Sequence, residues 1–513
     1  MFLLTALIVM WPMFGPGSPP GVDAPTFLHL SWMYHLAFTG QLDSLFLDPY
    51  WYGGFPYVAG YGPFSFLLIG GLSTITPVPI EIAYRIFLFL AYVGLGLSTY
   101  VLALEFEVRR PYAMFAGLLA MLSYPAFLAL GTYGWYTTLV GLPFGILGLT
   151  FAERALRLND RRWAAVAGIM LAILLLSNHH SGFAFGAGMV GWALARTAFP
   201  PTGPTPFSRW RMVQFIAITG GTAFLIVSPW FLYFLSNALE VRFEREVAGN
   251  WSVPIDEFRA RIFDRSHIGK EGYPTYWGIA QVSLGLCGLI YAAITRLRAV
   301  AVASFLLVAL WFAAGQQVNP LINIYPLSGF DLARFFLFLM PLFGLYAAIF
   351  MEAIVRSAEP WLGRPRTSAV LRPAALGLGA MLILAIPIAD AVAARPLLEP
   401  MEPPDEVWIA MDWLGSETPE DAAILAVGMQ YRPAWWVPLK TGRAVMDGWS
   451  DEGASSWRLI REVRMMGWSG RVDTVRLHEI MGQRNTNYLV IAQWLRHDSP
   501  WVYEEEVSGA PHL

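Results

Sequence analysis

The chain has 513 residues, of which 56% are hydrophobic and only 14% are charged, whereas soluble domains carry about 25% charged residues. The formal net charge of -3 argues against a nucleic-acid partner, and the single cysteine, Cys287, excludes a disulfide scaffold and a cysteine-based zinc site. A chain this long and this poor in charge must place its apolar surface in lipid, so the sequence predicts an integral membrane protein.

Apolar stretches run through most of the chain, and each is long enough, with its flanks, to cross a bilayer as a helix. They cover residues 1–14, 80–104, 112–130, 134–152, 162–178, 181–196, 212–236, 276–295, 299–314, 334–355 and 372–391. A further apolar segment, 64–76, is too short to span and is expected to be interfacial or re-entrant. The sequence therefore predicts an α-helical polytopic membrane protein with about eleven transmembrane helices.

Arginine is unevenly distributed among the connecting loops. Every second short loop is rich in arginine, and these loops lie at 109–110, 154–162, 196–211, 296–298 and 356–372. Such loops are predicted to be cytoplasmic, because cytoplasmic loops carry an excess of Arg and Lys. With an odd number of spans, the N-terminus is then cytoplasmic and the C-terminal segment is extracytoplasmic. The long segments 15–63, 237–275 and 315–333 fall on the outside.

The tail, residues 396–513, differs in kind from the rest of the chain. Short β-like runs alternate there with helical patterns around Asp405–Leu414 and Ser456–Met466; the runs are Ala423–Val427, Arg443–Asp447 and Tyr488–Ala492. This alternation is typical of a small α/β domain. We therefore expect a membrane domain over 1–395 and a soluble extracytoplasmic domain over 396–513. One interpretation of residues 509–513 is a ragged end that lacks a final strand.

The first outside segment concentrates acids, aromatic residues and turn formers at a membrane boundary. It contains Asp23, His29, Asp43, the run Asp48–Pro56 and the run Tyr61–Pro63. A carboxylate held at an apolar boundary is partly desolvated, which raises its basicity. The alternative is that Asp43 and Asp48 cap short helices or stay solvated.

An aspartate just after the first helix, a following histidine, and Gly-x-Pro and Tyr-Gly-Pro stretches resemble the GT-C membrane glycosyltransferases. Within them, the layout is similar to bacterial and archaeal oligosaccharyltransferase-like proteins and to membrane proteins labelled as 6-pyruvoyl-tetrahydropterin synthase-related. The resemblance covers the first-loop Asp, the spans and the outer C-terminal domain. It implies transfer of a hexose or pentose from a polyprenyl-phosphate donor to a saccharide, lipid or protein acceptor, at the outer face of the cell envelope.

The same resemblance implies roles for individual residues. Asp23 would be the general base that takes the proton of an acceptor hydroxyl; the alternative is a turn or N-cap residue ahead of a helix over 25–38. The candidate substrate-binding residues are His29, Asp48, Trp51 and Tyr61.

The leaving phosphate needs a cationic partner. Arg334 is the first candidate, since an arginine at an outer interface needs an anion and a guanidinium suits phosphate; alternatively, an Asp331–Arg334 pair anchors the helix. His179 and His180 interrupt an apolar hairpin and are further candidates, the alternative being a polar turn between two spans. Arg85 is a weaker candidate.

The sequence departs from the family pattern in its acids. Asp23 is followed by Ala24 rather than by a second acid, the second outside loop Gly131–Trp135 has none, and Trp435–Trp436 lacks the aspartate of a W-W-D-Y-G motif. These differences argue against peptide sequon recognition and against a tightly bound divalent metal such as Mg²⁺ or Mn²⁺, and the metal stays unknown.

Two other classes of function stay open. A non-catalytic GT-C-like protein that scaffolds envelope assembly fits the missing second acid. A transporter or flippase for lipid-linked material is the other class, but transporters carry intramembrane charges and paired repeats, and this sequence has few of the first and no visible repeat.

Overall fold

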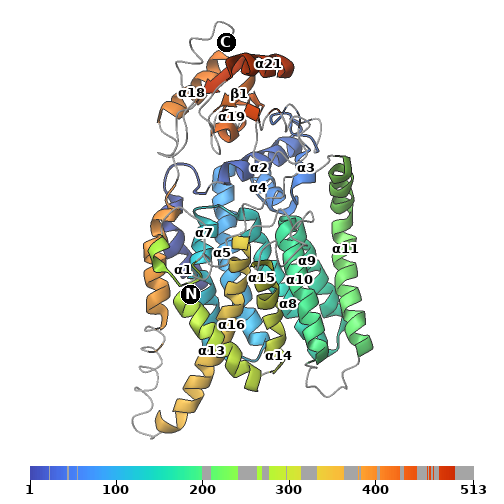
Figure 1. Cartoon of the computed structure of the whole chain (residues 1–513), viewed down its shortest axis with the longest axis vertical. Coiled ribbons are helices and arrows are strands. Elements are labelled where there is room, and N and C mark those ends of the chain that lie inside the picture. The colour runs from blue at the N-terminus through green and yellow to red at the C-terminus, as the bar shows by residue number, and fades with distance from the viewer. Residues whose placement is uncertain are drawn as a thin grey trace. The chain divides into compact units, whose positions relative to one another are not determined.

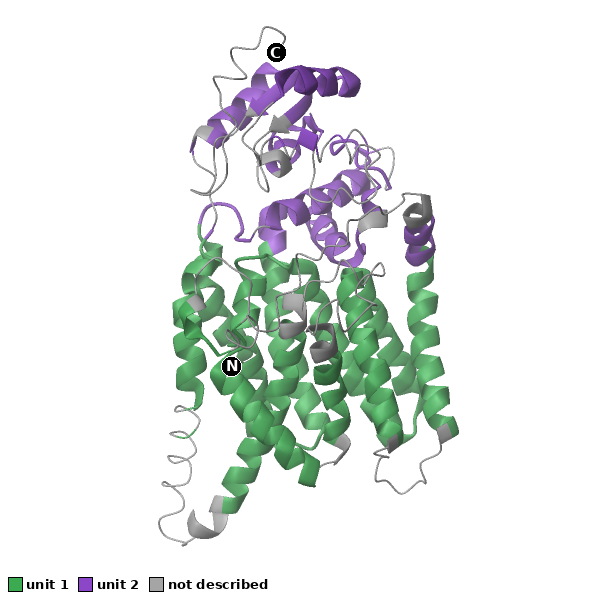
Figure 2. Ribbon diagram, viewed as in Figure 1, with its two compact units in different colours: residues 1–15, 85–229, 245–399 green, residues 16–84, 230–244, 400–513 purple. Residues whose placement is uncertain are grey.

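The structure is a computed structural model of the chain (Figure 1). It describes residues 1–21, 23–42, 46–52, 54, 56–198, 209–240, 263–268, 276–295, 297–313, 332–362, 379, 383–400, 405–427, 433–446, 459, 462–463, 466 and 473–491, with only the backbone at some helix ends. The chain divides into two compact units (Figure 2). Unit 1 comprises residues 1–15, 85–229 and 245–399, and unit 2 comprises residues 16–84, 230–244 and 400–513.

Unit 1 is helical in its described part. Its helices, two of which continue into unit 2, are α1 (Phe2–Met10), α5 (Ile80–Glu105), α6 (Arg110–Met121), α7 (Tyr124–Leu130), α8 (Tyr136–Leu158), α9 (Arg161–Ser177), α10 (His179–Ala198), α11 (Arg209–Glu240), α13 (Ile279–Thr295), α14 (Leu297–Val300), α15 (Ser304–Ala313) and α16 (Leu332–Leu362), with a further helix over residues 383–394. The 3₁₀ helices are η1 (Trp11–Phe14), η3 (Arg265–His267), η4 (Ala301–Ala303) and η7 (Arg395–Leu398).

Local signals explain how neighbouring helices turn and pack. Asn159 ends α8 in the left-handed conformation (φ 54°), and Asp160 starts α9 by accepting a hydrogen bond from the Arg162 amide, so α8 and α9 pack side by side. A Cβ at Gly288 of α13 would overlap the carbonyl of Tyr346 on α16. Glycine there allows two backbones to approach closely, as in other membrane helix pairs.

Several helices are suited to a membrane. Within the described residues, four are long and apolar enough to span: Ile80–Glu105, Tyr136–Leu158, Trp210–Ser236 and Leu337–Ser357. The expected span over 112–130 is instead the bent pair α6 and α7, with a 51° angle, because Pro125 in the first turn of α7 cannot continue a hydrogen-bonded helix from α6. The predicted helical membrane protein is confirmed, whereas the number of eleven spans stays a prediction.

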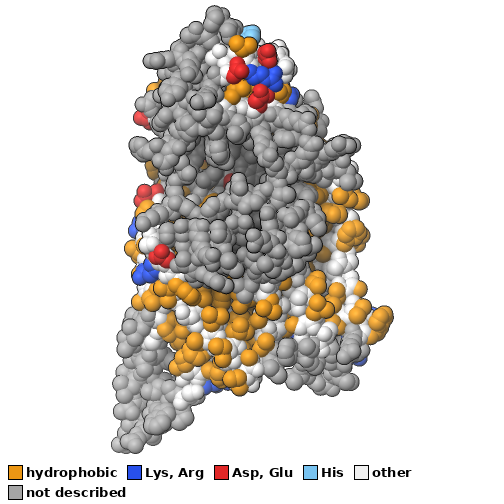
Figure 3. All heavy atoms as spheres, viewed as in Figure 1, with side chains coloured by type: hydrophobic (Ala, Val, Ile, Leu, Met, Phe, Trp, Pro, Cys, Tyr) orange, Lys and Arg blue, Asp and Glu red, His pale blue; other side chains and the backbone are white. Residues whose placement is uncertain are grey.

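Apolar side chains cover the outside of these helices. Figure 3 shows hydrophobic side chains gathered over unit 1, and Leu225, Ile294 and Leu307 are 74%, 79% and 67% exposed. Exposed apolar surface of this kind, here on α11, α13 and α15, is suited to lipid rather than to water.

Three buried glutamates pair with arginines in unit 1. The pairs are Glu105 with Arg154 and Arg157, Glu153 with Arg196, and Glu352 with Arg356, at 2.7–3.2 Å. All four arginines lie in loops, or at the ends of loops, that the arginine pattern predicts to be cytoplasmic. They therefore also neutralise acids that would be costly to bury alone.

Unit 2 combines the first loop with the tail. The first loop forms α2 (Ala24–Phe38) and α3 (Tyr57–Gly60), and the apolar segment too short to span forms α4 (Phe64–Ile75). The tail forms α18 (Asp405–Glu417), β1 (Ala423–Val427), α19 (Pro433–Thr441), β2 (Ala444–Val445), α21 (Thr474–Arg484) and β3 (Tyr488–Ile491). Both α4 and α19 pack against α2.

The three runs predicted as strands form one parallel sheet in the order β2-β1-β3. Parallel neighbours need crossover connections, which the intervening helices supply. One face packs on a core of Leu425, Met446, Val463, Leu477 and Ile480. The helix predicted over 456–466 lies mostly outside the described residues, and the domain boundary at residue 395 stays a prediction.

Candidate functional site

Asp23 lies directly before α2, in the N-cap position, but its side chain makes no capping hydrogen bond. The side chain is half-buried, and its charge acts on the phenol of Tyr84 at the start of α5. The partial positive charge of the α2 N-terminus favours a carboxylate there. Asp23 is thus held at a helix start without serving as the side-chain cap that the alternative interpretation expected.

His29 and Asp48 form a buried pair. Both side chains are 0% exposed, and His29 Nε2 lies 2.6 Å from Asp48 Oδ2. Asp48 Oδ1 accepts a second hydrogen bond, of 2.8 Å, from the Tyr50 amide. In this bond the carboxylate oxygen accepts and Nε2 donates, and His29 Nδ1 has no hydrogen-bond partner among the described residues.

This burial corrects the expectation that Asp48 caps a helix or stays solvated. The Tyr50 bond gives Asp48 a turn-forming role, while the His29 bond satisfies its other oxygen away from water. Asp43, which shared that expectation, lies outside the described residues.

Aromatic rings pack against His29. The Trp51 ring stacks on His29 with centroids 4.1 Å apart and an interplanar angle of 18°, and Tyr61 packs edge-on against Phe27 at 5.9 Å. The four predicted substrate-binding residues are all buried, since Trp51 is 1% and Tyr61 7% exposed. His29, Asp48 and Trp51 form the inner part of the cluster, whereas Tyr61 packs with Phe27 and Phe66.

Three residues of this cluster were not among the predicted site residues. The half-buried rings of Trp32 and Tyr50 lie 5.0 Å apart beside His29. His29 and Trp32 are three residues apart on a helix, a spacing that places them on one face and that the sequence does show. Burial and, secondarily, the charge of Asp48 raise the pKa of the Tyr50 and Tyr57 phenols, so both stay neutral donors at physiological pH.

The predicted phosphate-binding residues belong to unit 1 and are described apart from this cluster. Arg85 donates from Nη1 to the Gly15 carbonyl at 3.0 Å, which fixes the chain after η1. The side chain of Arg334, in α16, and residue Asp331 lie outside what the structure describes.

His179 and His180 begin α10, and their side chains are buried, with ring centroids 4.0 Å apart. The break before them is built by Asn178, which accepts from the Ser181 amide at 2.8 Å and donates to Thr137 Oγ1 at 2.9 Å. The described residues contain no group of three His, Cys, Asp or Glu side chains able to hold a metal ion.

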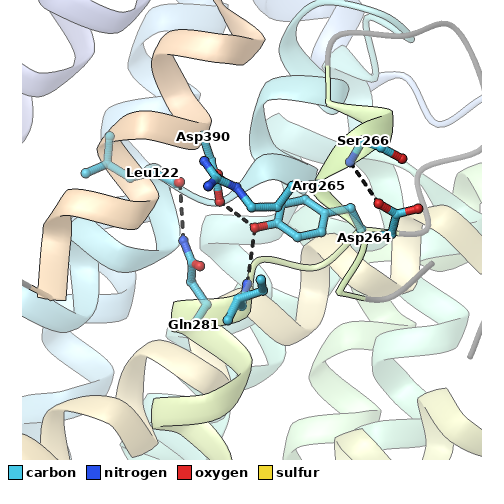
Figure 4. Close-up of polar contacts among 8 residues, drawn as sticks. Leu122, Asp264, Arg265, Ser266, Gln281 and Asp390 are labelled. Carbon is cyan, nitrogen blue, oxygen red and sulfur yellow. Dashed lines mark hydrogen bonds and ion pairs between the residues drawn. The ribbon is translucent and has the colours of Figure 1, made fainter. Parts of the chain in front are cut away.

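Unit 1 also contains a polar cluster, around Asp390, that the sequence did not predict (Figure 4). Asp390 is 2% exposed and accepts from Arg265 Nε at 2.8 Å and from the Tyr276 hydroxyl at 2.6 Å. Gln281 donates to the Leu122 carbonyl at the α6–α7 break, at 3.3 Å. Asp390 and Arg265 are 125 residues apart in the chain, so no local pattern indicated their pairing. Both oxygens of Asp390 are bonded, and the cluster ties residues of the segment 237–275 to the helix over 383–394.

Comparisons with known proteins bear on the fold. No family model and no curated protein matches the chain. Among solved structures, the Archaeoglobus fulgidus oligosaccharyltransferase is 14% identical with a TM-score of 0.63, over 95% of this chain and 69% of that one. The mycobacterial arabinofuranosyltransferase AftD is 16% identical with a TM-score of 0.65, over 99% of this chain and 36% of that one. ArnT from Cupriavidus metallidurans is 13% identical with a TM-score of 0.60, over 96% of this chain and 92% of that one.

These likenesses show that the chain is a membrane protein with a GT-C-like fold, as the first-loop residues and the layout led us to expect. At such low identity they show the fold alone, because one fold supports several functions and a function must be argued from its site.

Proposed function

We propose that the chain is a membrane glycosyltransferase that moves a sugar from a polyprenyl-phosphate donor to an acceptor, with Asp23 as the general base. The observation that carries this proposal is the half-buried carboxylate of Asp23 at the start of α2, which its own helix does not use as a cap. The GT-C-like fold supports it. Structures of two similar proteins, the archaeal oligosaccharyltransferase and ArnT, contain dolichol-phosphate and undecaprenyl phosphate.

In the proposed reaction, the acceptor hydroxyl attacks the anomeric carbon and its proton passes to Asp23. The bond between the sugar and the phosphate oxygen breaks, and the polyprenyl phosphate leaves with the electron pair of that bond. A carboxylate within hydrogen-bond reach of the acceptor contributes about 10²–10⁴ in rate.

The inner and outer layers of the first-loop cluster would divide the work. The buried His29, Asp48, Trp51 and Tyr61 would fix the shape of the loop, whereas the rings of Trp32 and Tyr50 keep exposed surface for contact with substrate, and Asp23 keeps exposed surface at the start of α2. The neighbouring rings of Trp32 and Tyr50 suit a sugar ring, which has flat apolar faces.

For the donor phosphate, Arg334 stays the first candidate and His179 and His180 the next. Arg85 ranks below them because it already donates to a backbone carbonyl. The described residues do not assemble a site for a divalent metal, and no step of the proposed reaction passes through one.

We also propose that the membrane domain covers 1–395 and that the tail is extracytoplasmic, with the N-terminus in the cytoplasm. Backbone hydrogen bonds join the first loop to the tail, at Tyr52 and Val445. Segments bonded in this way share one side of the membrane. The arginine-poor character of the loops on that side supports the outer one.

The test is Asp23→Asn in proteoliposomes supplied with dolichol-phosphate and undecaprenyl-phosphate sugars. Asn keeps the shape but cannot take the proton, so turnover should fall about 10²–10⁴-fold while the thermal stability and the donor affinity stay near those of the wild type. Asp160→Asn is the matched control, because Asp160 is an N-cap aspartate that does cap its helix. Near-normal transfer by Asp23→Asn would remove the base role. Wild-type protein inactive with every donor would favour the scaffold or flippase alternative.

A further inference from the structure

The edge of the tail's sheet is completed by the first loop. In the order β2-β1-β3, β2 is an outer strand, and an outer strand normally presents unpaired amides and carbonyls. Trp51 forms a parallel β-bridge with Val445 of β2. The Val445 amide donates to the Tyr50 carbonyl at 2.7 Å, and the Tyr52 amide donates to the Val445 carbonyl at 3.0 Å. The loop thus joins the sheet by strand addition.

The two sides of β2 use different residues. Both backbone polar groups of Val445 are bonded to the loop, whereas the next amide, of Met446, donates to Ile424 of β1 at 2.9 Å. The bonds to the loop can therefore be removed without removing those to β1. The loop also needs this support, since Tyr52 is a non-glycine residue held at φ 58°.

The bridge continues into the candidate site through Trp51. The Trp51 ring is stacked on His29, a residue of α2, and the amide of Tyr50 holds Asp48, which in turn accepts from His29. These contacts connect β2 to α2, the helix that begins directly after Asp23. An element that fixes Trp51 therefore fixes the orientation of α2.

A second contact ties the tail to the first loop region. Nζ of Lys440, in α19, lies over the rings of Trp408 and Trp436, at 5.6 and 5.5 Å from their centroids, and 3.1 Å from Glu81 at the start of α5. Tyr84, on which the charge of Asp23 acts, lies one turn further along α5. The tail thus contacts both helices that border Asp23.

We infer that the C-terminal domain is a positioning element for catalysis: the pairing of Val445 with Trp51 orients α2 and so places Asp23 against the acceptor. This inference rests on the proposed function. Val445 and Trp51 do not act on the reacting atoms but through the helix that bears the base. A displacement of about 1 Å at a reacting group can cost 10²-fold in rate, so a distant bond of this kind can control turnover.

The test is Val445→Pro in the full-length protein, with Val445→Ala as the matched control. Proline removes the amide that donates to Tyr50, whereas alanine keeps both backbone bonds and loses only side-chain volume. For Val445→Pro, the turnover number should fall about 10-fold or more with the donor KM unchanged. Val445→Ala should keep a turnover number close to that of the wild type.

A labelling experiment tests the bridge without any transfer assay. In a Cys287→Ser background, the variant Trp51→Cys should react slowly with a maleimide, because position 51 is 1% exposed. Adding Val445→Pro should raise the labelling rate about 10-fold or more, because the edge bond that covers this position is lost, and adding Val445→Ala should not. If the wild type proves inactive as a transferase, the labelling experiment still decides whether the pairing of Val445 with Trp51 keeps the first loop in place.

Two results would overturn the inference. One is fast labelling with unchanged turnover in Val445→Pro, which would show a bridge that does not position the base. The other is slow labelling in Val445→Pro, which would show that the bridge does not hold the loop. If Val445→Pro does not fold, Trp51→Ala and Trp51→Phe replace it: turnover should fall for alanine and be restored by phenylalanine, which keeps a ring against His29. Equal turnover in both variants would overturn the inference.

Discussion

The buried His29–Asp48 pair makes a quantitative prediction about stability. Both side chains are 0% exposed and 2.6 Å apart. Asp48→Leu would leave His29 Nε2 and the Tyr50 amide without an acceptor, and His29→Leu would leave a buried carboxylate with one hydrogen bond. Removing one partner of a buried pair costs about 3–5 kcal/mol, so each single variant should lose about that much free energy of unfolding.

The double variant should lose far less than the sum of the two. With both polar groups replaced by leucine, the remaining cost is mainly the Tyr50 amide, at about 1–3 kcal/mol. The coupling energy between the two sites should therefore be at least about 3 kcal/mol. Asp48→Asn, which can still accept from Tyr50, should be milder than Asp48→Leu, at about 1–3 kcal/mol.

A double-mutant cycle measures this coupling. The four proteins would be unfolded in mixed micelles by increasing SDS, with unfolding followed by near-ultraviolet circular dichroism, to which the stacked Trp51 contributes. Additivity of the two single effects within about 0.5 kcal/mol would refute the reasoning, because two residues that share a buried hydrogen bond cannot be independent.

Two further predictions concern other ion pairs. Arg196→Met should lower the free energy of unfolding of unit 1 by about 3–5 kcal/mol, because it leaves the buried carboxylate of Glu153 without its partner. Heating followed by size-exclusion chromatography would measure this loss, and adding Glu153→Leu to Arg196→Met should restore the stability. An Arg196→Met variant as stable as the wild type would contradict the pairing. In the tail, the hydrogen bond from Arg476 lowers the pKa of Glu462. Because this pKa is lower in the folded state, Glu462 stabilises the folded state at pH values above its ordinary pKa of 4.5. As the pH falls below 4.5, the unfolded state binds more protons than the folded state, and the stabilisation is lost. The melting temperature of the wild type should thus exceed that of Glu462→Gln at neutral pH, and the two should converge on acidification. A gap between the two melting temperatures that widened on acidification would contradict the lowered pKa of Glu462.

Much of the fold could be predicted because its signals are local. The lengths of apolar runs predicted α5, α8 and α11, and the β-like runs at 423–427 and 488–492 correspond to β1 and β3. A run of apolar residues reports the length of a helix but not its straightness. The bend between α6 and α7 therefore appeared only in the structure, although Pro125 is its local cause.

The candidate site could be predicted only in part. The sequence selected Asp23, His29, Asp48 and Trp51 from one loop, because acids, histidine and aromatics gather there at a membrane boundary. It could not tell that Asp48 is buried, since an acid in a turn-forming run has the same local pattern whether water or a histidine side chain satisfies it.

Only the tertiary structure decided which residues contact each other across long stretches of the chain. His29 reaches Asp48 across 19 residues, Asp390 reaches Arg265 across 125, and Trp51 meets Val445 from almost the other end of the chain. Composition and periodicity fix which face of an element is apolar and how long it is, because these depend on neighbouring residues. The partner that satisfies a buried polar group or an open strand edge depends on which segments the folded chain brings together, and no local pattern encodes that choice.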